Sequence, residues 1–256
     1  MSAPSVYLTL PSFDLFKFPP DDTPPALPPP SDESTLKSPF AIDADLYNAV
    51  LRPAVPLTFA CCYILGVTLL NAYNRSHNYK RWSIANTRLF HVFVILHNAI
   101  LAVYSFITFV AMVRAVSHVW PGFNQDNGLA GIADAFCKMQ GPRGLGDAVT
   151  YNATTSNWEV KNRLIQMMPD GTPDSTDVGR MWNEGLAFWG WFFYLSKYYE
   201  VVDTLIILAK GKRSPLLQTY HHAGAMLSMW AGMRYMSPPI WLFVFANSGI
   251  HSMMVG

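Results

Sequence analysis

The chain has 256 residues, of which 51% are hydrophobic, 14% aromatic and only 14% charged, and its formal net charge is +1. Charged residues make up about a quarter of an average soluble domain, so this composition favours a protein that lies in a lipid bilayer. The near-neutral charge argues against nucleic acid as a partner, because the basic residues lie in short clusters between apolar runs. Three cysteines without a CxxC pair do not form a disulfide scaffold or a cysteine metal site.

Residues 1–53 are predicted to form a disordered tail. Ten prolines occur in the first 40 residues, a density that favours an extended, polyproline-like chain. Residues 40–52 could form a short interfacial helix with Phe40, Leu46 and Val50 on one side, or an ordinary loop. The start of the chain lacks the basic and apolar regions of a cleavable signal peptide, so the first membrane segment would itself target the chain.

Five apolar stretches approach the length of about 20 residues that a membrane-spanning helix needs. The stretches cover residues 54–73, 89–113, 185–209, 219–236 and 240–256. We therefore predict an all-α, polytopic membrane protein whose transmembrane domain covers 54–256 and contains five helices.

The basic residues between these stretches predict an orientation. Lysine and arginine in short loops mark the cytoplasmic side of a membrane protein. They occur in the first connection (Arg75, Lys80, Arg81, Arg88) and in the third (Lys210, Lys212, Arg213). The N-terminus and the long polar connection 114–184 would then face the lumen of the endoplasmic reticulum. We expect 114–184 to be a lumenal insertion rather than a second enzymatic domain, with Asn152-Ala153-Thr154 as a candidate N-glycosylation acceptor.

Several charged residues interrupt the third apolar stretch. Each charge at the bilayer centre costs roughly 2.5–3.5 kcal/mol on insertion scales, so intramembrane charge marks a functional site by default. At 100° per residue, Lys197, Glu200 and Thr204 share one helical face and Asp203 lies about 60° from Glu200. The alternative interpretation is an ion pair between Lys197 and Glu200 that caps the helix end.

Histidines and amides add further polar positions on three other predicted helices. Gln218, His221 and His222 lie on one face at spacings of three and four residues. The other positions are His97, Asn98, Asn247 and His251. Such side chains avoid lipid, so we expect all of them to face the bundle interior. A di-iron centre is the alternative, but the chain has seven histidines and no HxxxH motif, which argues against a metal.

Three motifs on consecutive helices carry a family resemblance: KYYEVVDT (197–204), QTYHH (218–222) and NSGIHSMM (247–254). Their order and spacing resemble those of the ELO family of very-long-chain fatty acid elongases, particularly its fungal members, and the similarity runs from 54 to 256. The resemblance implies a seven-helix bundle around an acyl tunnel in the endoplasmic reticulum membrane. It also implies a 3-oxoacyl-CoA synthase that condenses a long acyl-CoA with malonyl-CoA, releasing carbon dioxide, without a cofactor or metal.

The resemblance also implies residue roles. His221 would carry the acyl group, His251 would act on the malonyl unit or its enolate, and His222 and Gln218 would orient the His221 imidazole. Lys197 would lie near the cytoplasmic mouth and, with three other basic residues, meet the phosphates of coenzyme A: Lys210, Lys212 and Arg213. Glu200 and Asp203 would hold the lysine and the histidines in register. The remaining supporting positions are Thr204, Tyr220, Asn247, His97 and Asn98.

Two departures from the family pattern leave a second interpretation open. Gln218 replaces the first histidine of the box and cannot ionise, which favours His221 as the acyl carrier. The family pattern continues beyond the methionine matching Met254 with two more helices, so we expect a C-terminally truncated chain. The alternative to an active enzyme is therefore an inactive membrane partner or regulator of a full-length elongase. Other expected partners are the reductase and dehydratase of the elongation cycle and a second copy of the chain.

Overall fold

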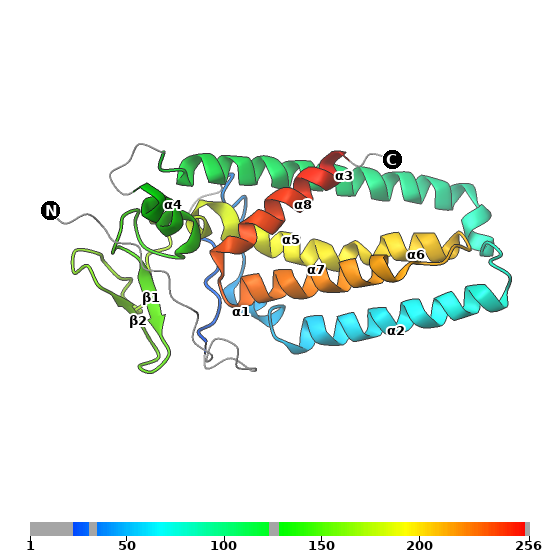
Figure 1. The fold of residues 1–256 in the computed structure, drawn as a ribbon, viewed down its shortest axis with the longest axis horizontal. Helices are drawn as coiled ribbons and strands as arrows, with labels where there is room; N and C mark the ends of the chain where they lie inside the picture. Colours follow the sequence, from blue (N-terminus) through cyan, green and yellow to red (C-terminus); the bar gives the residue numbers. More distant parts are fainter. Residues whose placement is uncertain (1–22, 31–34, 123–127, 254–256) are drawn as a thin grey trace.

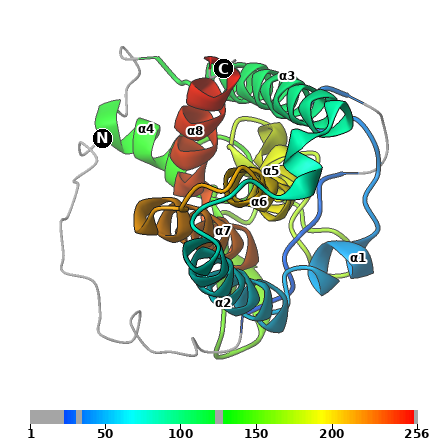
Figure 2. The same ribbon diagram turned by 90° about the vertical axis from the view of Figure 1, so that its right-hand side faces the viewer.

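The computed structural model describes residues 23–30, 35–122 and 128–253. Long helices run lengthwise through the molecule, and a short helix and a β-hairpin lie at one end (Figure 1). The helices are α1 (Ala44–Ala49), α2 (Ala54–Ser76), α3 (Arg88–Val119), α4 (Gly128–Cys137), α5 (Ala187–Tyr199), α6 (Val201–Ala209), α7 (Leu216–Arg234) and α8 (Trp241–Met253). In the end-on view, α5 and α6 lie in the middle of the other long helices (Figure 2). Of the predicted disordered tail, 1–22 and 31–34 lie outside the described residues. The prediction is wrong for 23–30, where Ala26 is 1% exposed and its backbone N–H donates to the side-chain oxygen of Asn48.

The segment before α2 is docked into the bundle. Asp43 caps α1, and its carboxylate accepts a hydrogen bond from the backbone N–H of Leu46. Tyr47 is fully buried, stacks on Trp191 and donates a hydrogen bond to the carbonyl oxygen of Ala187. Of the two structures left open for 40–52, a helix is present over Ala44–Ala49, with Leu46 half exposed on it. Phe40 precedes this helix and packs edge-on against Phe188 and Phe192 of α5.

Two helices in the described part of the chain are long and apolar enough to cross a membrane, namely α2 and α3. Helix α2 begins where the first apolar stretch begins and runs three residues further, to Ser76. Helix α3 extends the second stretch from 113 to Val119, so Arg114 and His118 belong to its last turns and not to a connection. The boundary expected at 114 is wrong, because Ala115 and Val119 pack into the core and continue the buried face of the helix.

The third apolar stretch is broken into two helices at Glu200. The Asp203 N–H bonds to the Glu200 carbonyl, three residues back, which tightens the backbone locally. A π-helical turn at Trp182–Leu186 precedes α5, and Gly185 inside it has φ of 130°, which favours glycine. The single helix predicted for 185–209 is therefore two helices, and the break lies at the buried glutamate.

Helices α7 and α8 are joined by a 3₁₀ turn at Pro238–Ile240, where the sequence predicts the break. Helix α8 lies along α3, and Phe245 of α8 packs on Phe109 of α3 with 5.0 Å between ring centroids. The last residues of the fifth predicted stretch, 254–256, lie outside the described residues, and the matched Met254 is one of them.

The connection between α3 and α5 is folded. Strands β1 (Val149–Asn152) and β2 (Asn157–Val160) form an antiparallel hairpin with Val149 opposite Val160, which an all-α prediction does not include. Arg180 is fully buried, forms an ion pair with Asp134 of α4 at 2.9 Å, and donates to four backbone carbonyls: Asp134, Gly141, Pro142 and Gly144. This arginine organises the connection through backbone groups that would otherwise be unpaired.

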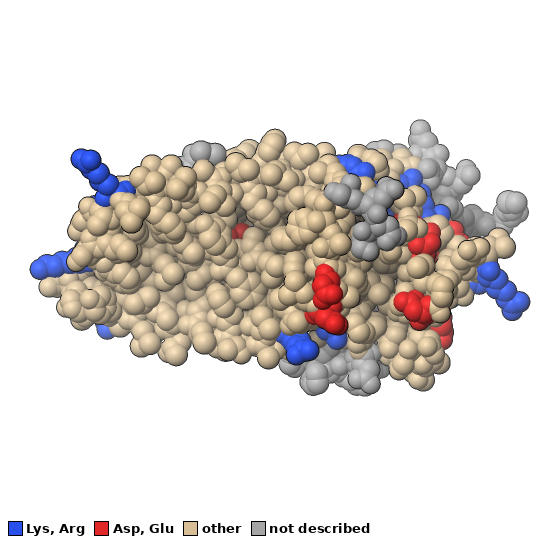
Figure 3. Space-filling model, turned by 180° about the vertical axis from the view of Figure 1, so that it is seen from behind, with Lys and Arg blue, Asp and Glu red and all other residues tan. Residues whose placement is uncertain are grey.

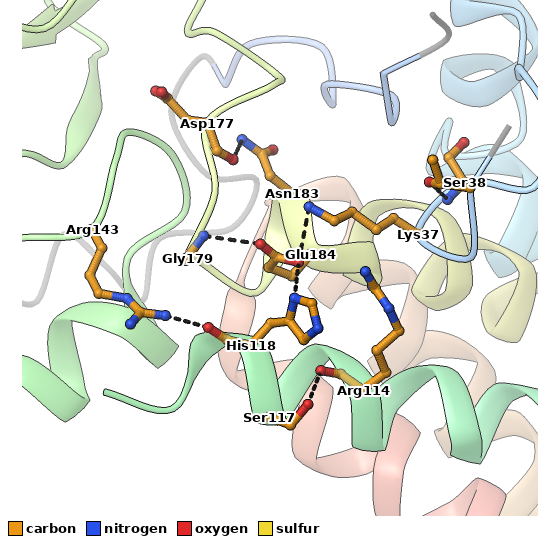
Figure 4. A network of polar contacts seen from close by, with 11 residues as sticks. Lys37, Ser38, Arg114, Ser117, His118, Arg143, Asp177, Gly179, Asn183 and Glu184 are labelled. Carbon is orange, nitrogen blue, oxygen red and sulfur yellow. Dashed lines mark hydrogen bonds and ion pairs between the residues drawn. The ribbon is translucent and has the colours of Figure 1, made fainter. Parts of the chain in front are cut away.

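A second polar network ties the connection to α3 and to the N-terminal segment (Figure 4). Glu184 is buried, and its carboxylate accepts from the Gly179 N–H at 3.1 Å and pairs with Lys37 at 3.0 Å. His118 at the end of α3 lies 3.6 Å from the same carboxylate. The N-terminal segment, the end of α3 and the α3–α5 connection therefore meet at the Glu184 carboxylate.

Charged residues differ between the two ends of the molecule. On the face shown in Figure 3, only lysine and arginine gather at the end formed by the α2–α3 and α6–α7 connections, and the zone beside it is almost free of charge. The opposite end carries both acidic and basic residues (Figure 3). This distribution is typical of a protein that crosses a membrane with its basic loops on one side.

The tight turn between α7 and α8 leads to a stability prediction. A Cβ atom added at Gly232 would lie 2.5 Å from Cγ1 and 2.7 Å from Cβ of Ile240, whereas at Gly224 of the same helix nothing lies within 4 Å. We expect Gly232→Ala to destabilise the protein by roughly 1–3 kcal/mol through overpacking. Gly224→Ala should be neutral or stabilising by up to about 1 kcal/mol, because alanine favours the helix. Thermal unfolding in detergent measures both, and equal midpoints would contradict this packing.

Candidate active site

A cavity of about 660 Å³ opens between α3, α6, α7 and α8. Seven of the polar residues singled out in the sequence line it: Asn98, Asp203, Gln218, His221, His222, Asn247 and His251. The apolar part of its wall comes from Leu101, Ala102, Ile250 and Met253. The predicted convergence of polar side chains from four helices is therefore present in the structure.

The two adjacent histidines of α7 lie in different environments. His222 is 3% exposed, and its Nε2 lies 2.8 Å from Nε2 of Gln218, one helical turn earlier. Its Nδ1 is buried without a hydrogen-bond partner among the described residues. His221 is exposed to the cavity, with 5.6 Å between the centroids of the two rings. Gln218 thus orients His222, and the expectation that it bonds directly to His221 is wrong, because a spacing of four residues brings it over His222.

Asp203 lines the cavity and is held by α3. His97 is buried, and its Nε2 lies 2.8 Å from an oxygen of the Asp203 carboxylate. The other ring nitrogen of His97 lies 3.0 Å from the hydroxyl of Tyr199. A tyrosine, an imidazole and a carboxylate therefore form a chain that ends at the cavity. Tyr199 lies inside the KYYEVVDT motif but was not among the predicted site residues.

Lys197 is 1% exposed and fully engaged inside the bundle. Its ammonium group donates to Glu200 at 2.6 Å and to the amide oxygen of Asn247 at 2.8 Å, and lies 3.7 Å from the centroid of the Phe193 ring. The ion pair considered as the alternative for these charges is therefore present. The expected role of Lys197 at a phosphate-binding mouth is wrong, because its donors are used within the protein.

Thr204 completes the shared face predicted for Lys197 and Glu200. Its hydroxyl is fully buried and lies 2.9 Å from the hydroxyl of Tyr63 on α2. The Tyr63 ring in turn packs edge-on against His222, with 6.3 Å between centroids. Tyr63 was not among the predicted site residues. It could have been found as a tyrosine that shares the buried face of α2 with Ala60 and Val67, because a buried tyrosine hydroxyl usually has a hydrogen-bond partner.

The remaining predicted residues lie away from this cavity. Tyr220 is 75% exposed and points out of the bundle, because it is offset from the Gln218–His222 face of α7. Lys212 is exposed in the α6–α7 connection, and Lys210 is half-buried in it. Arg213 lines a second cavity of about 400 Å³ at the basic end, together with Arg75 of α2, which was not among the predicted phosphate contacts.

Among the described residues, no group of three or more His, Cys, Asp or Glu side chains has the arrangement of a metal site. The histidines of α7 instead contact the amide of Gln218, the ring of Tyr63 and each other, and His251 of α8 lines the same cavity. The polar groups in the cavity are thus imidazoles, side-chain amides and one carboxylate, which suit acyl transfer.

Comparison with known proteins identifies the family. The family model described as "ELO: GNS1/SUR4 family" matches residues 49–256. The chain belongs to this family. Proteins of the ELO family are membrane proteins, in agreement with the two long apolar helices.

Individual relatives match a shorter part of the ELO chain. "Fatty acid elongase 2" of Trypanosoma brucei brucei is 33% identical over 78 residues, which cover 30% of this chain and 29% of the relative. A "Putative fatty acid elongase" of Dictyostelium discoideum is 37% identical over 99 residues, 38% of this chain and 32% of the relative. "Very long chain fatty acid elongase 3" of Homo sapiens is 32% identical over 72 residues, which cover 28% of this chain and 27% of the relative. The matches thus span about a third of these relatives or less, and no solved structure matches the chain.

Removing the buried lysine tests the polar centre of the bundle. Lys197→Met leaves the Glu200 carboxylate buried without its cation, and we expect a loss of about 3–5 kcal/mol in unfolding free energy. The double variant Lys197→Met/Glu200→Gln removes both charges and should recover most of this loss. Thermal unfolding of the two variants and the wild type in detergent measures the difference. A double variant no more stable than the single one would contradict a direct ion pair.

Proposed function

We propose that this chain carries the condensing centre of a very-long-chain fatty acid elongase, which joins a long acyl-CoA to malonyl-CoA. The observation that supports the proposal is that His221 and His222 of α7 and His251 of α8 line one cavity with Asp203, Gln218 and Asn247. Family membership and the names of the relatives, which are fatty acid elongases, support fatty acid elongation as the overall process.

The first step is transfer of the acyl group to His221. This imidazole is open to the cavity, whereas His222 is buried and bonded to Gln218. A ring nitrogen of His221 attacks the thioester carbonyl, the carbon–sulfur bond breaks, and the coenzyme A thiolate takes the proton lost by the imidazole. The product of this step is an acyl-imidazole. The hydrogen bond between Gln218 and His222 holds the first turns of α7, and with them His221, in place.

The second step joins the malonyl unit to the acyl group. Malonyl-CoA loses carbon dioxide to give an enolate, whose carbon attacks the acyl carbon. The carbon–nitrogen bond then breaks, and the imidazole of His221 leaves as an anion that takes a proton from water. The product is a 3-ketoacyl-CoA with two more carbons. His251 and Asn247 lie on the α8 side of the cavity and can hold the enolate oxygen by hydrogen bonds.

The orientation in the membrane is part of the proposal. Five crossings, formed by α2, α3, α5 with α6, α7 and α8, bring both basic connections to the cytoplasm, where coenzyme A substrates are soluble. The N-terminus and the α3–α5 connection then face the lumen of the endoplasmic reticulum. The all-basic end of the molecule supports this orientation (Figure 3).

Two histidine variants test the chemistry. We expect His221→Ala and His251→Ala each to reduce incorporation of labelled malonyl-CoA into 3-ketoacyl-CoA by at least about 100-fold, because a nucleophile or general acid–base group is lost. Tyr220→Phe is the matched control, since its side chain is adjacent but points outward. The assay uses microsomes of an elongase-deficient host that express each form equally. A wild-type chain that is abundant in the membrane but inactive would contradict the proposal and favour an inactive partner of a full-length elongase.

The basic connection provides a second test. We expect Lys212→Ala/Arg213→Ala to raise the KM for malonyl-CoA several-fold with little change in kcat, because attraction to the coenzyme A phosphates is lost. Lys161→Ala/Arg163→Ala removes two exposed cations from the opposite end and should leave the KM unchanged. Equal effects of the two pairs would contradict entry of coenzyme A at the α6–α7 connection.

A further inference from the structure

The end of the β1–β2 hairpin presents an Asn-x-Thr sequence in an exposed turn. Asn152 is the last residue of β1, and residues 153–156 of the turn are all exposed. The Asn152 side-chain oxygen accepts from the backbone N–H of Thr154 at 2.9 Å, which bends the chain directly after the asparagine. The hairpin lies at the end of the molecule away from the basic connections (Figure 1).

We propose that Asn152 is the acceptor of an N-linked oligosaccharide. The donor is a lipid pyrophosphate-linked oligosaccharide of the secretory membrane. The side-chain nitrogen of Asn152 bonds to the anomeric carbon of the first sugar and loses one proton, and the bond from that carbon to the phosphate oxygen breaks, so that the lipid pyrophosphate leaves. The proposal rests on the orientation proposed above and is independent of the condensation chemistry.

The register of the hairpin directs Asn152 away from the protein core. Successive side chains of a strand point to opposite faces, and Asn152 pairs across the hairpin with Asn157 while Tyr151 pairs with Trp158. Trp158 packs against the hydrophobic core, so the face that carries Asn152 and Glu159 faces solvent. A glycan on Asn152 therefore extends into water without displacing a packed side chain.

One exposed contact must be released for the reaction. The Asn152 side-chain N–H donates to the carboxylate of Glu159 at 2.8 Å, and Glu159 is exposed on the partner strand. Water can replace such a bond at small cost. The acceptor nitrogen is thus accessible in the folded hairpin, and no strand pairing has to open.

The chain contains a second acceptor sequence, of the Asn-x-Ser type, whose asparagine is in the opposite environment. Asn74-Arg75-Ser76 lies at the end of α2 beside the basic connection, and Asn74 is 1% exposed. Its side-chain N–H donates to the Leu208 carbonyl at 2.8 Å, and its oxygen accepts from the indole N–H of Trp82 at 2.8 Å. Burial and location both exclude Asn74 as an acceptor, so modification should occur at one site.

The experiment expresses the full chain with a C-terminal epitope tag in a eukaryotic host and follows its gel mobility with and without endoglycosidase H. We expect one glycan on the wild-type chain, which the enzyme removes. Asn152→Gln and Thr154→Ala should each abolish the shift, whereas Thr154→Ser should restore it, since serine also supplies the hydroxyl. Thr155→Ala and Ser76→Ala are matched controls that should keep the glycan. A chain without a glycan, in membranes that glycosylate a reporter protein, overturns the proposal, as does a shift that survives Thr154→Ala.

Cysteine labelling separates failure of the orientation from failure of the modification. Cys137 of α4 is exposed and lies on the same side of the bundle as the hairpin. In a Cys61→Ala/Cys62→Ala chain, a membrane-impermeant maleimide should label Cys137 only after the microsomes are permeabilised. A protected Cys137 with no glycan overturns the glycosylation proposal alone. Labelling in intact microsomes overturns the orientation and the glycosylation together, and leaves the histidine chemistry to its own assay.

Discussion

A charge in an apolar bundle must be paired, and the buried Lys197–Glu200 ion pair meets this requirement at the centre of the molecule. Lys197 also donates to Asn247, which fixes α8 against α5 one helical turn before His251. The break between α5 and α6 lies at Glu200, so the same residue sets the helix geometry and neutralises the lysine. This ion pair therefore positions the polar residues of α6 and α8 that line the cavity.

Other polar contacts extend this centre to the surrounding helices. Asp203 is tied to His97 of α3, and Thr204 is tied to Tyr63 of α2, whose ring packs against His222 of α7. Each contact joins the α5–α6 pair to a different neighbour. Hydrogen bonds of this kind specify which helix faces meet, because apolar packing alone tolerates several arrangements in lipid. In the proposed function, His221 and His251 are the groups that act on the substrate.

The two ends of the bundle serve different purposes in the proposed function. The basic end has a cavity lined by Arg75 and Arg213, where a phosphate-bearing carrier can approach. The other end is closed by folded structure around Arg180 and Glu184, which pair the backbone and side chains of three separate segments. The hairpin at this end carries Asn152 on its solvent-facing side, while Trp158 on the other side packs on the core.

The helical class, the apolar stretches and the set of polar residues could be predicted from the sequence, because these depend on composition and on spacings of three and four residues within one helix. The sequence also identified the three motifs and, through them, the family. Seven of the predicted polar residues line the cavity, since lipid leaves the bundle interior as the only favourable environment for them.

The partner of each polar group depends on how the helices pack, which the sequence does not reveal. Lys197 turned inward to Asn247, fifty residues away, Gln218 bonded to His222, and Tyr220 faced outward. Tyr63 and Tyr199 joined the site through contacts between helices that local spacing cannot reveal. The folded connection around Arg180 was hidden for the same reason, because its stability comes from one buried side chain that reaches backbone carbonyls of distant residues.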